Sequence, residues 1–265
     1  QNARLKTRNC KQPVRTQQLN NSIVKTIIRR GKYILLFLEK EGQQAGMLVI
    51  HLGMSGKLSL IPSALQDFKP EKHDHVLLGL NETSTMVFND QRRFGYLAYY
   101  PFTSEAEFAA FKNLGPEPLG PGFTPHTLAG ALAGRTGPIK TVLLNQEIIA
   151  GLGNIYVCEA LYEAGISPRR KALTVKGRRA AALCGSIKSV LNRAIRAGGS
   201  TLRNYRSLSG ESGYFQTSFS VYDRKGLACP SCSCGARSDM KLLDKGIKRI
   251  VQSGRSTYYC SIKQR

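Results

Sequence analysis

Residues 151–160 read GLGNIYVCEA, and this stretch indicates how the second half of the chain is built. Two glycines and an asparagine precede a run with helical spacing, which predicts a helix beginning at Asn154. The first turn of a helix has unpaired backbone N–H groups and the positive end of the helix dipole, so it suits a phosphate. Taken alone, the stretch is better explained as an ordinary Gly-Asn helix start.

A second stretch of the same kind is GGSTLRNY (198–205), where two glycines and a serine precede a short predicted helix carrying Arg203. A long predicted helix separates the two starts, so together they could bind two points on one phosphate backbone. Charge agrees with this interpretation. Residues 151–265 contain 21 basic and 6 acidic side chains, whereas residues 1–150 contain 18 and 11. The pair of helix starts in the more basic half therefore favours nucleic acid.

The overall composition narrows the class of partner. The chain has 265 residues, 39 of them Lys or Arg and 17 Asp or Glu, and its net charge is +22. Apolar residues make up 42%, which predicts a globular body rather than a disordered basic tail. A polyanion is the expected partner, nucleic acid before an anionic membrane. The sequence shows neither an apolar run of the roughly 20 residues that span a membrane nor a secretory signal.

The coarse pattern along the chain changes near residue 104. Seven short runs that are β-branched or aromatic come first and predict a β-sandwich or barrel. Helical patterns follow, and a hairpin with a Gly-Arg tip closes the chain. The predicted strands are 22–28, 33–38, 47–52, 57–61, 75–80, 84–88 and 96–100, the helices 104–113, 124–134, 139–149, 154–165 and 175–198, and the hairpin strands 247–251 and 256–259. GPEPLGPGF (115–123) is the expected interdomain linker.

A polar turn, NDQRRFG (89–95), places Arg92 and Phe94 between two predicted strands. An aromatic ring can wedge into a base stack while a guanidinium bonds base edges. A hairpin whose Phe94 turns inward explains the turn equally well. HLGMSG (51–56) places Met54 on another such turn, and KHDH (72–75) suits phosphate contact or structural hydrogen bonds better than a metal.

The cysteines gather near the C-terminus. CPSCSC (229–234) and YYC (258–260) resemble a zinc ribbon built on a hairpin, with Cys229, Cys232, Cys234 and Cys260 as candidate ligands. The second Cys-x-x-Cys pair is incomplete, because Lys263 stands where the partner of Cys260 would be. A hairpin that binds no zinc therefore remains the alternative interpretation. The odd total of seven cysteines argues against a disulfide scaffold and for a reducing compartment.

In this order the segments resemble the formamidopyrimidine-DNA glycosylase / endonuclease VIII family, and HLGMSG and the RRF turn resemble its formamidopyrimidine branch. The resemblance runs from about Arg29 to the end of the chain. It implies an α+β fold with an N-terminal β-sandwich (1–114), a helix–two-turn–helix domain (115–217) and a C-terminal zinc-ribbon-like β-hairpin (218–265). The matching segments are RRGKYILL (29–36), HLGMSG, KHDH, FNDQRRFG (88–95), LGPEPL (114–119), residues 144–168, AGGSTLRNY (197–205), GYFQ (213–216), VYDRKG (221–226) and IVQSGRSTYYC (250–260).

The same resemblance implies a base-excision repair enzyme. It would remove oxidised purines (8-oxoguanine and formamidopyrimidines) opposite cytosine from double-stranded DNA, and then cleave the strand at the abasic site. Excision requires the base to be flipped out of the duplex. In the family pattern Lys32 assists β-elimination and Arg255 assists δ-elimination. Met54, Arg92 and Phe94 fill the void, with Arg92 facing the orphan base. The other DNA-binding candidates are His73, Arg135, Lys140, Asn154, Arg203, Tyr214 and Arg255.

The family's nucleophile is an N-terminal proline followed by a glutamate, and no Pro-Glu occurs before Lys32 in this sequence. One interpretation is that the N-terminal segment is missing from the sequence, and this is favoured because Lys32 and Arg255 are in place. The alternative is a non-catalytic relative that binds damaged DNA. A basic zinc-ribbon protein of RNA explains the charge and the cysteines, but not the RRF turn. We expect a monomer in the bacterial cytoplasm or an organelle, not a secreted protein.

Overall fold

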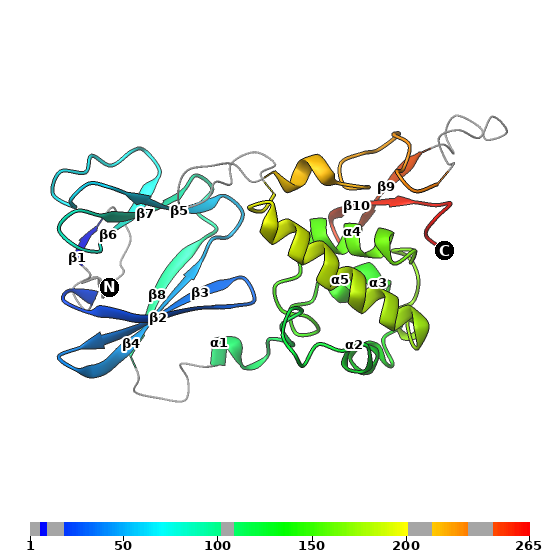
Figure 1. Ribbon diagram of the computed structural model, residues 1–265, viewed down its shortest axis with the longest axis horizontal. Coiled ribbons are helices and arrows are strands. Elements are labelled where there is room, and N and C mark those ends of the chain that lie inside the picture. Colours follow the sequence, from blue (N-terminus) through cyan, green and yellow to red (C-terminus); the bar gives the residue numbers. More distant parts are fainter. Residues whose placement is uncertain (1–5, 10–18, 102–108, 201–213, 233–245) are drawn as a thin grey trace. The chain divides into compact units, whose positions relative to one another are not determined.

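A computed structural model describes residues 6–9, 19–101, 109–200, 214–232 and 246–265 of the chain (Figure 1). The chain divides into two compact units. The N-terminal unit runs to Asn113, and the C-terminal unit comprises Leu114–Gly199 with Tyr214–Arg265. The helices after Leu114 and the terminal hairpin thus share one unit. The three predicted domain boundaries stay a prediction.

The N-terminal unit is built on two four-stranded antiparallel sheets, which confirms the predicted sandwich (Figure 1). One sheet has the order β2-β3-β4-β8, with β2 at Ile23–Arg30, β3 at Tyr33–Lys40, β4 at Gln43–His51 and β8 at Tyr96–Pro101. The other has the order β1-β6-β7-β5, with β1 at Lys6–Asn9, β6 at Asp74–Gly79, β7 at Thr85–Asp90 and β5 at Gly56–Ile61. The seven predicted strands are present, and β1 is an eighth that the pattern did not indicate.

Alternation along the strands supplies the core of this unit. Leu36 and Leu38 on β3, and Leu48 and Ile50 on β4, are buried in one cluster with Phe88 on β7. Because side chains alternate between the faces of a strand, every second residue reaches the space between the sheets. Each such side chain contributes about 1.5–3 kcal/mol by leaving water.

Strand register brings several turns to one end of the sandwich. In the first sheet Arg30 pairs with Tyr33, Tyr33 with His51, and His51 with Tyr96. In the second sheet Gly56 pairs with Asp90, and Asp74 pairs with Asn89. The connections that follow or precede these pairs therefore cluster, namely residues 31–32, 52–55, 72–73 and 91–95.

The C-terminal unit packs helices against a hairpin (Figure 1). Its helices are α2 (Pro125–Leu132), α3 (Ile139–Leu143), α4 (Asn154–Glu163) and α5 (Arg178–Arg196), with the 3-10 turns η3 (Ala172–Thr174) and η4 (Phe215–Ser218). Strands β9 (Ile247–Gln252) and β10 (Arg255–Cys260) form the hairpin. A further short helix, α1 (Ala109–Lys112), ends the N-terminal unit. The predicted threonine cap of α2 is confirmed, because Thr124 Oγ1 accepts from the Thr127 N–H.

One expectation for residues 115–149 was wrong. The helix predicted over 139–149 ends at Leu143, because the Asn145 side chain accepts the Glu147 N–H at 3.0 Å and starts a turn. The linker predicted over 115–123 stays a prediction, and its first residue is packed. Gly115 N donates to Gln146 O at 2.9 Å, and a Cβ on Gly115 would lie 2.5 Å from Glu147 O.

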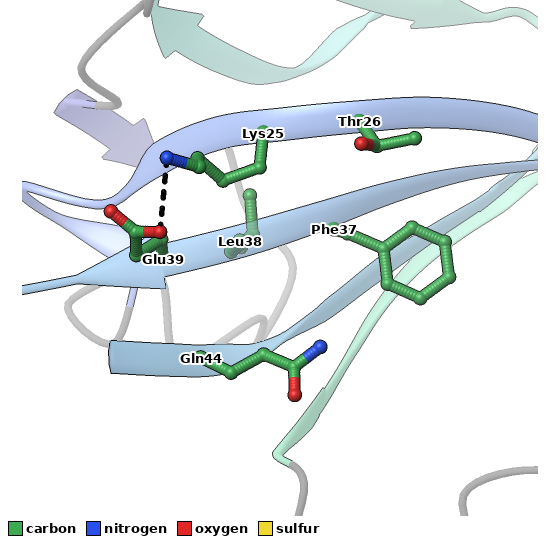
Figure 2. A pocket seen from close by; sticks show the side chains of 6 residues that line it. All are labelled: Lys25, Thr26, Phe37, Leu38, Glu39 and Gln44. Atoms are coloured by element: carbon green, nitrogen blue, oxygen red, sulfur yellow. Dashed lines mark ion pairs between the residues drawn. The ribbon is translucent and has the colours of Figure 1, made fainter. Parts of the chain in front are cut away.

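A pocket lies on the face of β2, β3 and β4 turned away from the sandwich core (Figure 2). Phe37 and Leu38 both line it, although Leu38 also belongs to the core cluster, and Lys25 pairs with Glu39 at 3.1 Å in the lining. The register places this pocket at the opposite end of β2 and β3 from the 31–32 turn. In the part of the chain that the structure describes, no helix is both long and apolar enough to cross a membrane.

Candidate functional site

A single buried carboxylate organises two of the clustered turns. Asp90, at the end of β7, is 0% exposed and accepts hydrogen bonds from Ser55 Oγ (2.5 Å), Gly95 N (2.7 Å) and Arg92 N (3.2 Å). Ser55 belongs to the 52–55 turn, whereas Arg92 and Gly95 belong to the 91–95 turn. Both turns are therefore fixed to the same carboxylate.

The hydrogen bonds keep this carboxylate charged. Burial by itself would raise the pKa of Asp90, but bonds from Ser55 and from the backbone N–H groups of Gly95, Arg92 and Arg93 outweigh it and lower the pKa. A buried anion with several N–H donors is the arrangement that makes such burial tolerable. The same negatively charged carboxylate, that of Asp90, thus holds both turns under exposed basic residues.

The two turns also touch through their backbones. Gly53 has φ 62°, and a Cβ there would lie 2.5 Å from the Phe94 carbonyl carbon, so only glycine allows this approach. Above this contact the side chains point outward: Met54 is 71% exposed and Phe94 56%. The alternative of an inward Phe94 was wrong. The Arg92 guanidinium lies 4.9 Å from the centre of the Phe94 ring, which aligns the cation with the ring face.

Lys32 lies at the same end of the sandwich, exposed in the turn between β2 and β3. Its charge acts on His51, the last residue of β4: burial first, and then Lys32, lowers the pKa of His51. The His51 Nδ1 accepts from the Gly53 N–H at 3.1 Å, and its ring stacks on Tyr96. His51 therefore stays neutral and links the Lys32 turn to the Met54 turn.

The KHDH segment (72–75) supports these turns through hydrogen bonds. His75 Nε2 donates to Asp90 O at 2.8 Å, and Asp74 Oδ1 accepts from Asn89 Nδ2 at 2.7 Å. His73 is half-buried in the preceding turn, and its carbonyl accepts the Asp90 N–H at 3.0 Å. Structural hydrogen bonds thus account for Asp74 and His75, and Lys32, Met54, His73, Arg92 and Phe94 come together at one end of the unit.

The C-terminal unit has a second group of predicted residues, around the start of α4. Asn154 Nδ2 donates to Ser256 O (3.0 Å) on β10 and to the Tyr222 hydroxyl (3.2 Å). Arg255 precedes Ser256 and is exposed at the tip of the hairpin, beside Ser253 and Gly254 with positive φ. Asn154 and Arg255 are 101 positions apart in the sequence, and the structure brings both to the N-terminus of α4.

Lys140 lies in the interior of the unit, near this group. Its side chain is 0% exposed, and its Nζ has no hydrogen-bond acceptor among the described residues. Burial lowers the pKa of Lys140, the Cys158 thiol opposes this, and Arg255 lowers it further. The structure therefore places Lys140 inside the unit, where the charge of Arg255 acts on it, and its predicted role in DNA binding stays a prediction.

The other DNA-binding candidates do not join this group. Arg135 is exposed after α2, and its Nε donates to Ala131 O at 2.8 Å. Tyr214 is 67% exposed, and its N–H donates to Ala197 O. Arg203 and the short helix predicted after Ser200 lie outside the described residues.

Three of the four predicted cysteine ligands converge. The Sγ atoms of Cys229, Cys232 and Cys260 all lie within 4.8 Å of one another, and Cys229 and Cys260 are buried. Three thiols at one point are a donor set that suits a thiophilic ion. Cys234 lies outside the described residues. The cluster therefore fits a metal with three identified ligands.

Sequence reasoning missed the residues that hold the site from inside. Asp90 stood within NDQRRFG, but nothing in the pattern distinguished a buried anchor from a polar turn. Glu159 stood inside an apolar helix, which is an unusual place for a carboxylate. It is 2% exposed and accepts from the backbone N–H groups of Ser220 (2.8 Å), Val221 (2.9 Å) and Tyr222 (2.8 Å). This fixes the segment that presents Tyr222 to Asn154.

Comparison with known proteins agrees with this arrangement. Residues 1–97 match the family described as the formamidopyrimidine-DNA glycosylase N-terminal domain, and residues 114–206 match the formamidopyrimidine-DNA glycosylase H2TH domain. A formamidopyrimidine-DNA glycosylase of Paracoccus denitrificans is 46% identical over 257 residues, covering 95% of this chain and 86% of the relative. One of Rhodospirillum centenum is 46% identical over 245 residues, covering 90% and 82%.

Solved structures are similar over the same extent. The Fpg (MutM) protein of Thermus thermophilus superposes with a TM-score of 0.81 at 34% identity, covering 99% of this chain and 90% of that one. The Lactococcus lactis Fpg in complex with DNA containing an abasic site gives a TM-score of 0.82 at 29% identity, covering 100% and 92%. With relatives above 40% identity along nearly its whole length, this chain belongs to the formamidopyrimidine-DNA glycosylase family.

Proposed function

We propose that the protein is a DNA glycosylase that removes oxidised purines, 8-oxoguanine and formamidopyrimidines, from double-stranded DNA. The observation that carries the proposal is the exposed set of Met54, Arg92 and Phe94 above the buried Asp90. Apolar side chains that protrude from a rigid base can enter a base stack and occupy the gap of a flipped nucleotide. Arg92, aligned over Phe94, then bonds the edge of the orphan cytosine.

Phosphate binding is assigned to the C-terminal unit. The first turn of α4 offers backbone N–H groups and the positive end of a helix dipole, and Arg255 adds a full charge beside it. Arg135, Arg203 and Tyr214 stay proposed DNA contacts outside this group. Lys140 contributes through its charge beneath Arg255. Phosphate contacts fix the position of the duplex, and the N-terminal unit reads the lesion.

Strand cleavage would follow base removal. The secondary amine of an N-terminal proline attacks C1′ of the sugar, the base leaves, and a Schiff base remains. Lys32 then assists β-elimination and Arg255 assists δ-elimination, each as a cation beside developing negative charge. The proline and its glutamate are not in the sequence as given.

A Zn²⁺ ion is the proposed ion of the cysteine cluster, held by Cys229, Cys232 and Cys260. Bound there, it would supply structural cross-linking between the 229–232 turn and the end of β10. The chain's own contribution is to position the hairpin tip: β10 carries Arg255 at one end and Cys260 at the other. Cross-linking the cysteine end therefore restricts the motion of Arg255.

Borohydride trapping tests the catalytic proposal. The complete protein is incubated with a duplex containing 8-oxoguanine opposite cytosine and reduced with borohydride, and a covalent protein–DNA adduct is expected. Undamaged duplex is the matched substrate control. Tight binding of an abasic-site duplex without any adduct would refute the enzyme and leave a damage-binding protein. Preference for structured RNA over lesion DNA would refute both.

A further inference from the structure

The second half of the cysteine motif ends in a lysine. Cys229 and Cys232 are separated by two residues, and the same spacing leads from Cys260 to Lys263. The Sγ atoms of Cys229 and Cys232 lie 2.9 Å apart, and those of Cys232 and Cys260 lie 3.5 Å apart. Lys263 therefore stands at the position in the sequence where a second Cys-x-x-Cys pair would have its fourth cysteine.

The Lys263 side chain makes two contacts beside the cluster. Its Nζ donates to Ser231 Oγ at 3.2 Å and lies 4.1 Å from the centre of the Tyr162 ring. The Tyr162 hydroxyl and Ser231 Oγ are themselves joined by a hydrogen bond of 2.8 Å. Ser231 stands between Cys229 and Cys232, so this triangle connects the cysteine turn, helix α4 and the residues after β10.

We propose that Lys263 replaces a fourth metal ligand by acting as a cation outside the coordination sphere. Three thiolates would hold the ion, and the ammonium group ties the Ser231 turn to the residues after β10. This proposal rests on the metal site proposed above.

Charge and bonding capacity support this role. A protonated amine has three donors and no lone pair, so it cannot ligate a cation while it bonds Ser231. Zn²⁺ with three thiolates carries one net negative charge, and a single nearby ammonium offsets it. No other His, Cys, Asp or Glu of the described residues converges with the three thiols. The rival fourth ligand is Cys234, two positions after Cys232.

Cobalt substitution counts the thiolates. The purified full chain is loaded with Co²⁺, and the intensity of its thiolate-to-cobalt charge-transfer band is measured with the band of a four-thiolate zinc ribbon as standard. We expect an intensity of about three quarters of that standard, since three thiolates bind. Cys234→Ser should leave the band unchanged, while Cys260→Ser should lower it. Cys184→Ser, which removes a thiol on α5 outside the cluster, is the matched control.

Two substitutions of Lys263 test its role. Lys263→Cys should raise the charge-transfer band by about one third, because a fourth thiolate completes the site. Lys263→Met keeps the length and removes the charge, and should weaken Zn²⁺ binding in a chelator competition by about threefold to tenfold.

Three results would overturn the proposal: no uptake of Co²⁺ or Zn²⁺, a lower band in Cys234→Ser, or equal Zn²⁺ affinity for Lys263→Met and the wild type. If Lys263→Cys does not fold, the wild-type band and Lys263→Met still decide. Borohydride trapping is independent of these readouts. A protein that traps normally but takes up no metal therefore refutes this inference alone.

Discussion

Replacing Asp90 with asparagine tests whether one buried carboxylate holds the turns that carry Met54, Arg92 and Phe94. The carboxylate accepts Ser55 Oγ and Arg92 N on one oxygen and Gly95 N on the other. An asparagine keeps one acceptor oxygen, but its amide group then faces an N–H or O–H donor. The change preserves volume while it removes the charge and at least one hydrogen bond.

The cost follows from these contacts. If the asparagine oxygen keeps the hydrogen bond from Ser55, the Gly95 N–H loses its bond to a charged acceptor. A buried donor is then left unpaired. We expect Asp90→Asn to lower the free energy of unfolding of the N-terminal unit by about 2–4 kcal/mol. Asp67→Asn, which changes an exposed carboxyl of the same unit, should lower it by less than about 0.5 kcal/mol.

The pH dependence has a definite sign. Because the folded pKa of Asp90 lies below its ordinary value of 3.8, its stabilisation is complete above that value and is lost as pH falls through the folded pKa. Asp90→Asn lacks this contribution, so the difference between variant and wild type should shrink in acid.

Hydrogen exchange localises the effect. Amides of residues 91–95 should exchange faster in Asp90→Asn, whereas those of α4 should be unchanged. Urea denaturation of the full chain gives the change in stability. A variant as stable as the wild type, with unchanged exchange at residues 91–95, would refute the role of Asp90 as the anchor of both turns.

Three further predictions concern binding and charge. Arg92→Ala should abolish the preference for cytosine opposite the lesion and retain abasic-site binding. Competition binding with the four opposing bases measures this preference. An unchanged preference would contradict the orphan-base role. Lys140→Met should raise the free energy of unfolding at neutral pH by about 1–3 kcal/mol, since a buried donor without a partner is removed, with exposed Lys176→Met as control. Because burial lowers the pKa of Lys140, wild-type stability rises with pH between the folded pKa and 10.5. The stability gained by Lys140→Met should therefore fall over that range. A destabilised Lys140→Met would show that the charge is paired. DNA affinity should fall about 40-fold between 50 and 200 mM salt if about three phosphates are neutralised, and a nearly flat titration would count against the phosphate contacts.

The elements of the fold were largely readable from local patterns. Alternation over residues 33–38 and 47–52 predicted β3 and β4, because half-buried strands must place apolar side chains at every second position. The helix after Gly153 and the capped helix after Thr124 were equally local signals. Helix α3 was predicted too long, since its apolar period continues past Leu143 although the Asn145 side chain diverts the backbone.

The candidate site was only partly readable. Arg92, Phe94 and Met54 were identified as turn residues, and the thiols of Cys229, Cys232 and Cys260 do converge. Whether Phe94 points outward was an even choice from the sequence. The burial of Lys140 was not predicted, because a helix as short as α3 does not show from its sequence which face meets the core.

Residue type and periodicity, which act over a few positions, were enough to establish strands, helices, net charge and the identity of the reactive side chains. Strand register and helix packing join positions far apart in the chain, and these decided the rest. They brought Ser55 and Gly95 to Asp90, Tyr222 to Asn154 through Glu159, and Lys263 to Ser231 in the cysteine turn. Such contacts depend on long-range geometry, so no local pattern specifies them.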